Sequence, residues 1–92
     1  MADSKVAYPA IIQSSDHQTK IHFPDLPAAD VMDPDAQHAR LRAKIGLAIV
    51  IIDLESHYET VPSPSSLADV KAQVGTDAQV ELIWTDLMCF SS

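Results

Sequence analysis

The segment from Asp33 to Tyr58 predicts one long helix that is apolar on two sides, and this pattern limits the folds open to the chain more than any other feature. At about 100° of rotation per residue, one stripe collects small and aliphatic side chains. Its members are Ala36, Ala39, Ala43, Leu47, Val50, Ile51, Leu54 and Tyr58. Such a stripe packs on a sheet. Because a small domain has one core, the other apolar side requires a second partner.

A second stripe lies roughly opposite the first. Its members are Leu41, Ile45, Ala48, Ile49 and Ile52. Burial within the chain, against Ser66–Val74 or against the C-terminal Leu87–Phe90, is one explanation. Five aliphatic positions on a solvent face would form a patch of the size that marks interaction sites. We therefore predict an oligomer or partner interface here, whose symmetric form is a homodimer with facing helices.

The predicted helix has a clear start. Asp33 suits the N-cap, Pro34 suits the first helical position, and the later prolines of the Val61–Ser66 segment forbid continuation. Gly46 is the weak position inside it, costing about 1 kcal/mol relative to alanine. The apolar run Ile45–Ile52 alone could be a buried strand, but the helical periodicity extends beyond it on both sides.

Alternating side chains predict strands around this helix. Val6–Gln13 and Thr19–Phe23 read as an antiparallel hairpin, Ala28–Met32 as a short third strand, and Ala78–Leu87 as the last strand. Pro9 requires a sheet edge or an unpaired N–H position. Ser66–Gln73 suits a short helical turn ended by Gly75. The predicted class is α+β, with order β-β-β-α-β, an antiparallel-rich sheet and one long helix packed on one face.

Length and composition favour one domain over residues 1–92, with residues 1–5 disordered. No apolar run is long enough to cross a bilayer and no secretory signal begins the chain, so we expect a cytoplasmic protein. Cys89 is the only cysteine. It therefore excludes an internal disulfide and a Cys-based zinc site, and we interpret it as a small hydrophobic residue.

The formal net charge is −7, from six Lys and Arg against thirteen Asp and Glu. Phosphate binding depends on cationic side chains, so charge disfavours direct nucleic-acid binding. A basic protein partner would be attracted and steered. The simpler explanation is that moderate negative charge keeps the protein soluble.

Several proline-containing motifs together resemble the HicB-like antitoxin family. The resemblance spans Tyr8 to Leu87. It depends on the order and spacing of the motifs. They lie on both sides of the long helix and come before a terminal strand that ends in Thr85-Asp86-Leu87. The signature residues are Tyr8, Pro9, Ala10, Phe23, Pro24, Asp25, Leu26, Pro27, Pro62 and Pro64. The chain departs from the family pattern at Ala28-Ala29, where Gly-Cys is common, and in a first hairpin turn without glycine.

The resemblance implies a partial ribonuclease-H-like fold and an antitoxin that self-associates, as a homodimer or higher oligomer. It also implies a small basic HicA-type mRNA interferase as the partner, which the antitoxin neutralises by protein–protein contact. Many family members carry a C-terminal DNA-binding module. This sequence stops at Ser92, so we expect no such module here.

A ribonuclease-H-like fold calls for a search for clustered carboxylates that could bind magnesium. Asp25, Asp30, Asp33 and Asp86 are available, but each has a simpler structural use, and the four histidines lack ligand spacing. We predict no catalytic, metal or cofactor site. The protein is thus expected not to be an enzyme, with a metal-dependent nuclease as the residual alternative.

The alternative function is an RNA-binding or RNA-processing protein. Arg40, Arg42 and Lys44 form the one basic cluster, but helical geometry turns Arg42 away from the other two. Few aromatic residues are present for base stacking, and Trp84 is expected in the core. A solvated helix flank explains the cluster more simply.

Overall fold

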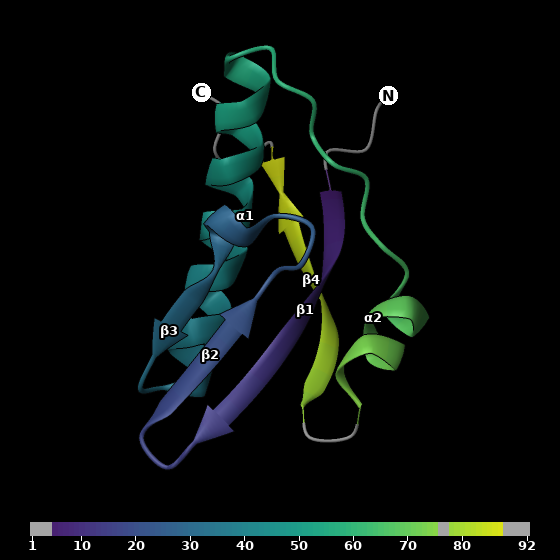
Figure 1. Ribbon diagram of the computed structural model, residues 1–92. Helices are drawn as coiled ribbons and strands as arrows, with labels where there is room; N and C mark the ends of the chain where they lie inside the picture. The colour runs from purple at the N-terminus through teal and green to yellow at the C-terminus, as the bar shows by residue number, and fades with distance from the viewer. Residues whose placement is uncertain (1–4, 76–77, 88–92) are drawn as a thin grey trace.

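The computed structural model describes residues 5–75 and 78–87 and shows a four-stranded antiparallel sheet with a long helix against it (Figure 1). The strands are β1 (Lys5–Ser15), β2 (Gln18–His22), β3 (Val31–Asp33) and β4 (Gln79–Asp86), arranged in the order β3-β2-β1-β4. The helices are α1 (Ala36–Ser56) and α2 (Leu67–Val74), with a 3-10 turn at Pro27–Ala29. The predicted α+β class and antiparallel sheet are confirmed.

The strand register sorts side chains onto two faces of the sheet. Paired residues share a face, as Ile12 does with Ile21 and Tyr8 with Ile83. The side chains on this face are buried and form the core together with α1 and with Phe23, Leu26 and Ala29 of the segment after β2. We call this the helix face. The opposite face carries the alternate residues, which include Pro9, Ile11, Leu82 and Trp84.

The predicted sheet-facing stripe of α1 is confirmed along most of its length. Ala39, Ala43 and Leu47 are completely buried and Ile51 nearly so. Val50 and Leu54 are partly buried against the same cluster. Small side chains near the start of the helix allow its backbone to approach the sheet closely, because alanine takes little space between the two layers.

The start of α1 differs from the sequence prediction by two residues. Asp35, not Asp33, is the N-cap, and its carboxylate accepts hydrogen bonds from the backbone N–H groups of Gln37 and His38. Asp33 ends β3 instead and accepts a bond from the N–H of Asp35 at 2.9 Å. The two aspartates flank Pro34, and aspartate is a preferred N-cap residue, so the sequence alone does not distinguish the two positions.

The predicted end of the helix is also too late. α1 ends at Ser56, and Tyr58 adopts a positive φ of 58° with its side chain 98% exposed. The prediction that Tyr58 belongs to the sheet-facing stripe is therefore wrong. A left-handed residue after the last turn ends a helix by satisfying its free carbonyl groups, and here Tyr58 and Glu59 donate to the carbonyls of Glu55 and Leu54.

The hairpin and Pro9 follow the expectation from sequence. β1 and β2 are joined through Asp16 and His17 without glycine. β1 lies inside the sheet, but β2 pairs with it only from Ile11 to Ser15. Pro9 therefore lies beyond the β2 ladder and pairs on one side only, opposite Leu82 of β4. Of the two expected environments for Pro9, the unpaired N–H position is the one observed.

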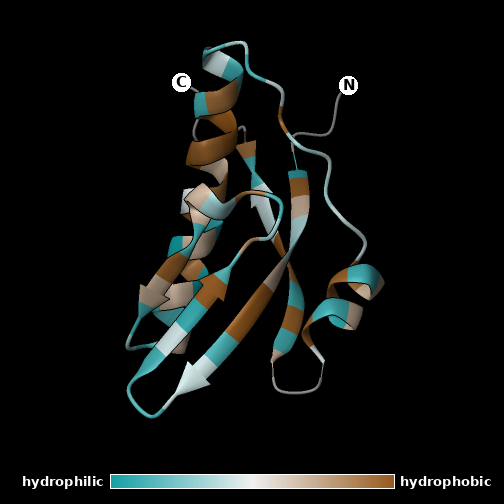
Figure 2. Cartoon of the chain, in the orientation of Figure 1, coloured by the Kyte–Doolittle hydropathy of each residue, from teal (hydrophilic) through white to brown (hydrophobic). Residues whose placement is uncertain are grey.

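The short helix α2 packs on the face of the sheet opposite α1. Its Val74 lines a hollow together with Ile11, Lys20 and His22, which lie on that opposite face, and its Val70 is buried outside the main cluster. Ser66 caps α2. Gly75 ends it, as the sequence predicts. In Figure 2 the C-terminal half of α1 is largely hydrophobic on the side in view. Among the described residues, the other helix, α2, lies on the far face of the sheet from α1.

The two glycines give opposite predictions for stability. A Cβ on Gly46 would meet the Ala29 carbonyl oxygen at 3.8 Å, an ordinary contact, whereas Gly75 has φ 72° and ψ −148°. We expect Gly46→Ala to stabilise the chain by about 0.5–1 kcal/mol and Gly75→Ala to destabilise it by about 1–3 kcal/mol. Urea denaturation followed by circular dichroism measures both. A destabilising Gly46→Ala would show that α1 and the Ala29 turn are packed more tightly than described.

Candidate interaction surface

The second apolar stripe of α1 lies on the side of the helix that faces away from the sheet. Leu41 is 53% and Ile49 is 54% exposed, and Ile45 and Ile52 are partly exposed. We call Leu41, Ile45, Ile49 and Ile52 the outer face of α1. Large aliphatic side chains gain about 25 cal/mol for each Å² of surface removed from water. Burying this face against another protein would therefore contribute favourable free energy to the association.

Ala48, the fifth member of the predicted stripe, is completely buried. The accessible part of the patch is therefore the outer face of α1 without Ala48. Of the two intrachain explanations for the stripe, Ser66–Val74 forms α2 on the opposite face of the sheet. Leu87 packs partly against the core cluster, and residues 88–90 lie outside the described part of the chain.

Two arginines fix the flanks of α1 to the sheet. The Arg40 guanidinium donates to both carboxylate oxygens of Glu81 in β4, at 2.9 and 3.3 Å. Arg42 donates to the Asp33 carboxylate at 3.1 Å and to the Met32 carbonyl oxygen. Two of the three members of the basic cluster therefore already bind carboxylates, which weakens the case for an RNA-binding site on this helix.

Asp33 is the centre of a polar network at the start of α1. Its carboxylate accepts from the Asp35 N–H and from Arg42, and lies 2.7 Å from Nδ1 of His38. The backbone hydrogen bond from Asp35 is the largest influence holding the pKa of Asp33 below its usual value; burial opposes it, and His38 and Arg42 add to the lowering. This network orients α1 relative to β3 and so positions the outer face.

Acidic side chains gather at the C-terminal end of α1. Asp53, Glu55 and Glu59 are exposed there, close in sequence to Tyr58, whose side chain is 98% exposed. The apolar outer face therefore continues into an acidic end that carries an aromatic side chain. Aromatic residues with one polar atom are common anchors at protein interfaces. This combination of an apolar strip and negative charge suits a basic protein partner.

Several of the signature residues pack in the interior or attach the Val61–Ser66 connector, while Pro27, Pro62 and Pro64 are exposed. Phe23 and Leu26 are buried. The Asp25 carboxylate accepts from the Ser65 backbone N–H at 2.9 Å and from the Ser65 hydroxyl at 2.7 Å. The Tyr8 hydroxyl donates a hydrogen bond to the Pro62 carbonyl oxygen. Burial raises the pKa of Tyr8, and the nearby Asp25 charge raises it further. The Tyr8 hydroxyl thus stays protonated and keeps its role as the hydrogen-bond donor.

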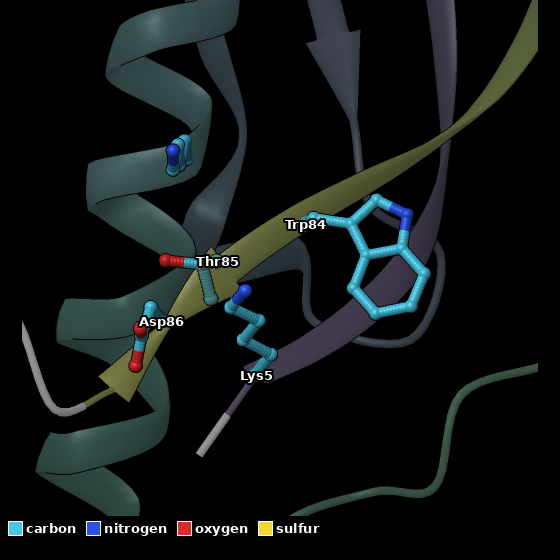
Figure 3. Close-up of a pocket in the computed structure, with 5 residues that line it drawn as sticks. Lys5, Trp84, Thr85 and Asp86 are labelled. Atoms are coloured by element: carbon cyan, nitrogen blue, oxygen red, sulfur yellow. The ribbon is translucent and has the colours of Figure 1, made fainter. Parts of the chain in front are cut away.

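Trp84 does not lie in the core, contrary to the sequence prediction. Its side chain is 57% exposed on the face opposite α1, while the neighbouring Ile83 and Thr85 are buried. Figure 3 shows Thr85 directed toward α1 and the Trp84 ring on the other side of β4. The alternation was read correctly, but the register shows that the helix covers the face of Ile83 and Thr85.

No group of three or more metal-ligating side chains occurs among the residues that the structure describes. Asp25 and Asp33 are held in the contacts given above, and Asp30 accepts from the Phe23 N–H and lies 2.6 Å from Nδ1 of His22. Within the same described ranges, no helix is long and apolar enough to span a membrane.

This sheet and helix arrangement is similar to that of solved toxin–antitoxin proteins. A toxin–antitoxin complex from Streptococcus pneumoniae matches with a TM-score of 0.77 at 19% identity, over 96% of this chain and 74% of that one. The N-terminal domain of the Burkholderia pseudomallei antitoxin HicB matches with a TM-score of 0.75 at 16% identity, over 85% of this chain and 95% of that one.

A third similar structure is a HicA3 and HicB3 toxin–antitoxin complex, with a TM-score of 0.62 at 16% identity, over 88% of this chain and 96% of that one. No protein-family model and no curated protein sequence matches the chain. At sequence identities of 16–19% the structural similarity establishes the fold alone. The chain has the fold of the HicB N-terminal domain, so the resemblance seen in the sequence is confirmed at the level of the fold.

The Asp33 network predicts a specific pH dependence of stability. The folded-state pKa is lowered, so the stabilisation is complete above the unfolded-state value of about 3.9 and is lost as pH falls through the lower folded-state value. We expect Asp33→Asn to destabilise the chain at pH 7, and this difference from the native chain to shrink below about pH 4. Urea denaturation at several pH values measures it. The exposed Asp53→Asn is the control, and a difference that stays constant with pH would contradict the assignment.

Proposed function

We propose that this chain is a non-enzymatic, antitoxin-like binding protein that self-associates and neutralises a small basic HicA-type mRNA interferase by protein–protein contact. The observation that carries the proposal is the HicB-like fold combined with an exposed apolar surface on its main helix. The fold is shared with chains found in toxin–antitoxin complexes. The outer face of α1 supplies a surface for such a contact.

Charge supports a basic partner over RNA. The formal net charge is −7, and the acidic end of α1 adjoins the outer face. An electrostatic field of this sign speeds the encounter with a cationic protein. It repels the phosphate backbone of RNA, and the two arginines of α1 are already paired with Glu81 and Asp33.

The proposed mechanism is steric masking. An mRNA interferase needs a cationic surface to bind its substrate, because affinity for nucleic acid depends mainly on neutralising phosphates. An acidic protein that covers this surface competes directly with RNA. In the proposed complex, Leu41 and Ile49 supply apolar contact, and Asp53, Glu55 and Glu59 pair with cationic side chains of the toxin.

The direct test is co-expression with a small basic HicA-type mRNA interferase, for which the adjacent reading frame is the first candidate, followed by purification and an RNA-cleavage assay. We expect a stable complex in which cleavage is suppressed at stoichiometric antitoxin. Failure to form any complex would remove the antitoxin assignment. RNA retardation by the isolated chain at low salt, steeply reduced by added salt, would instead support the RNA-binding alternative.

The double variant Leu41→Asp, Ile49→Asp tests the surface. Both side chains are more than half exposed, so the fold should survive, while removal of the apolar contact should weaken toxin binding by about tenfold or more. Ala72→Asp, Gln73→Asp, at two exposed positions of α2, is the matched control, because it adds the same two negative charges. Isothermal titration calorimetry gives the affinities, and circular dichroism checks folding. Equal affinity of the double variant and the control would place the toxin elsewhere.

A further inference from the structure

The outer edge of β4 is a second exposed surface that the proposed toxin contact does not use. In the described part of the chain, β4 ends the strand order and pairs with β1 alone. Exposed edge strands are usually protected by lysine, proline, a bulge or short length. β4 is eight residues long, QVELIWTD, and contains neither lysine nor proline. Its edge is therefore suited to pairing with another strand.

Pro9 indicates which backbone groups face this edge. In a hydrogen-bonded antiparallel pair both residues exchange N–H and C=O groups, and proline has no N–H. The pair of Pro9 and Leu82 is thus of the non-hydrogen-bonded type. The backbone groups of Leu82 then point away from β1, as do those of Val80 and Trp84 by alternation.

We propose that two copies of this chain join β4 to β4 in antiparallel orientation, forming one continuous eight-stranded sheet, an inference that rests on the self-association proposed above and assigns it a surface. The strand is self-complementary when Ile83 lies on the two-fold axis. Leu82 then lies opposite Trp84 of the second copy, and the reverse pair follows by symmetry. Leu82 is 41% and Trp84 57% exposed on the same face, so pairing covers both through an aromatic–aliphatic cross-strand contact.

An unsatisfied hydroxyl on the helix face supports the same register. The Thr85 Oγ1 atom is buried and has no hydrogen-bond partner among the described residues, which is unusual for a buried polar group. Pairing centred on Ile83 places Thr85 opposite Glu81 of the second copy. The Glu81 carboxylate binds Arg40 but keeps further lone pairs. It can therefore accept a hydrogen bond from the Thr85 hydroxyl of the second copy.

Local charge favours a second copy over a basic partner at this edge. Lys5, Lys44 and Asp86 line the hollow beside Trp84 (Figure 3), and the Arg40–Glu81 pair is neutral in sum. The net charge of −7 is therefore carried by other parts of the chain. A cationic protein gains no electrostatic attraction here, and two acidic copies can approach with little repulsion.

The test uses the chain alone, without a toxin. Sedimentation equilibrium measures the dimer dissociation constant of the native chain and of Trp84→Lys. We expect the variant to weaken dimerisation by about tenfold or more. Met32→Lys is the matched control, because Met32 is 53% exposed on the same face of the sheet but lies in β3, at the opposite edge. It should change the constant by less than about twofold.

Amide hydrogen exchange supplies a readout that needs no variant. In dilute monomer, the amides of Leu82 and Trp84 should exchange quickly and those of Ile83 and Thr85 slowly. In concentrated dimer all four should be slow. A native chain that stays monomeric at about 100 µM, or a dimer that Trp84→Lys leaves intact, would overturn the proposal. A dimer that Ile49→Asp dissociates instead would place the second copy on the outer face of α1.

Discussion

The packing of α1 on the helix face of the sheet is the contact on which the rest of the structure depends. Ala39, Ala43 and Leu47 are completely buried there, in the cluster that also contains side chains from β1, β2 and β4. The chain is too short to build a second core, so the layer formed by this contact provides the main burial. The polar links at the flanks of α1, Arg40–Glu81 and Arg42–Asp33, then fix how the helix is rotated about its axis. That rotation leaves Leu41 and Ile49 exposed.

The surfaces left after folding differ in charge and in chemistry. The outer face of α1 is aliphatic and leads into acidic residues and Tyr58, which suits a cationic protein. The edge of β4 offers backbone groups and Trp84, with a balanced set of charges around it. In the proposed account, the first surface binds a toxin and the second binds another copy. Each copy in a dimer would therefore keep its toxin-binding face, because the two surfaces lie on different elements.

Periodicity in the sequence predicted the long helix, its buried stripe, the hairpin and the last strand, because local spacing determines which side chains share a face. It misplaced the cap of α1, since Asp33 and Asp35 have the same local chemistry and only the end of β3 distinguishes them. It could not find the bonds of Asp25 to Ser65 or of Arg40 to Glu81, which join residues 40 and 41 positions apart. It placed Trp84 in the core because alternation identifies two faces without saying which one a helix covers.

The central claim is that the outer face of α1 is a protein-binding surface, and methyl NMR of the labelled chain tests it most directly. The partner added is a small basic HicA-type mRNA interferase, the partner class proposed above. The account predicts that the methyl signals of Leu41, Ile45, Ile49 and Ile52 shift or broaden on complex formation, while those of the buried Leu47 and Ile21 change little. A complex that forms and leaves the four outer signals unchanged would contradict it.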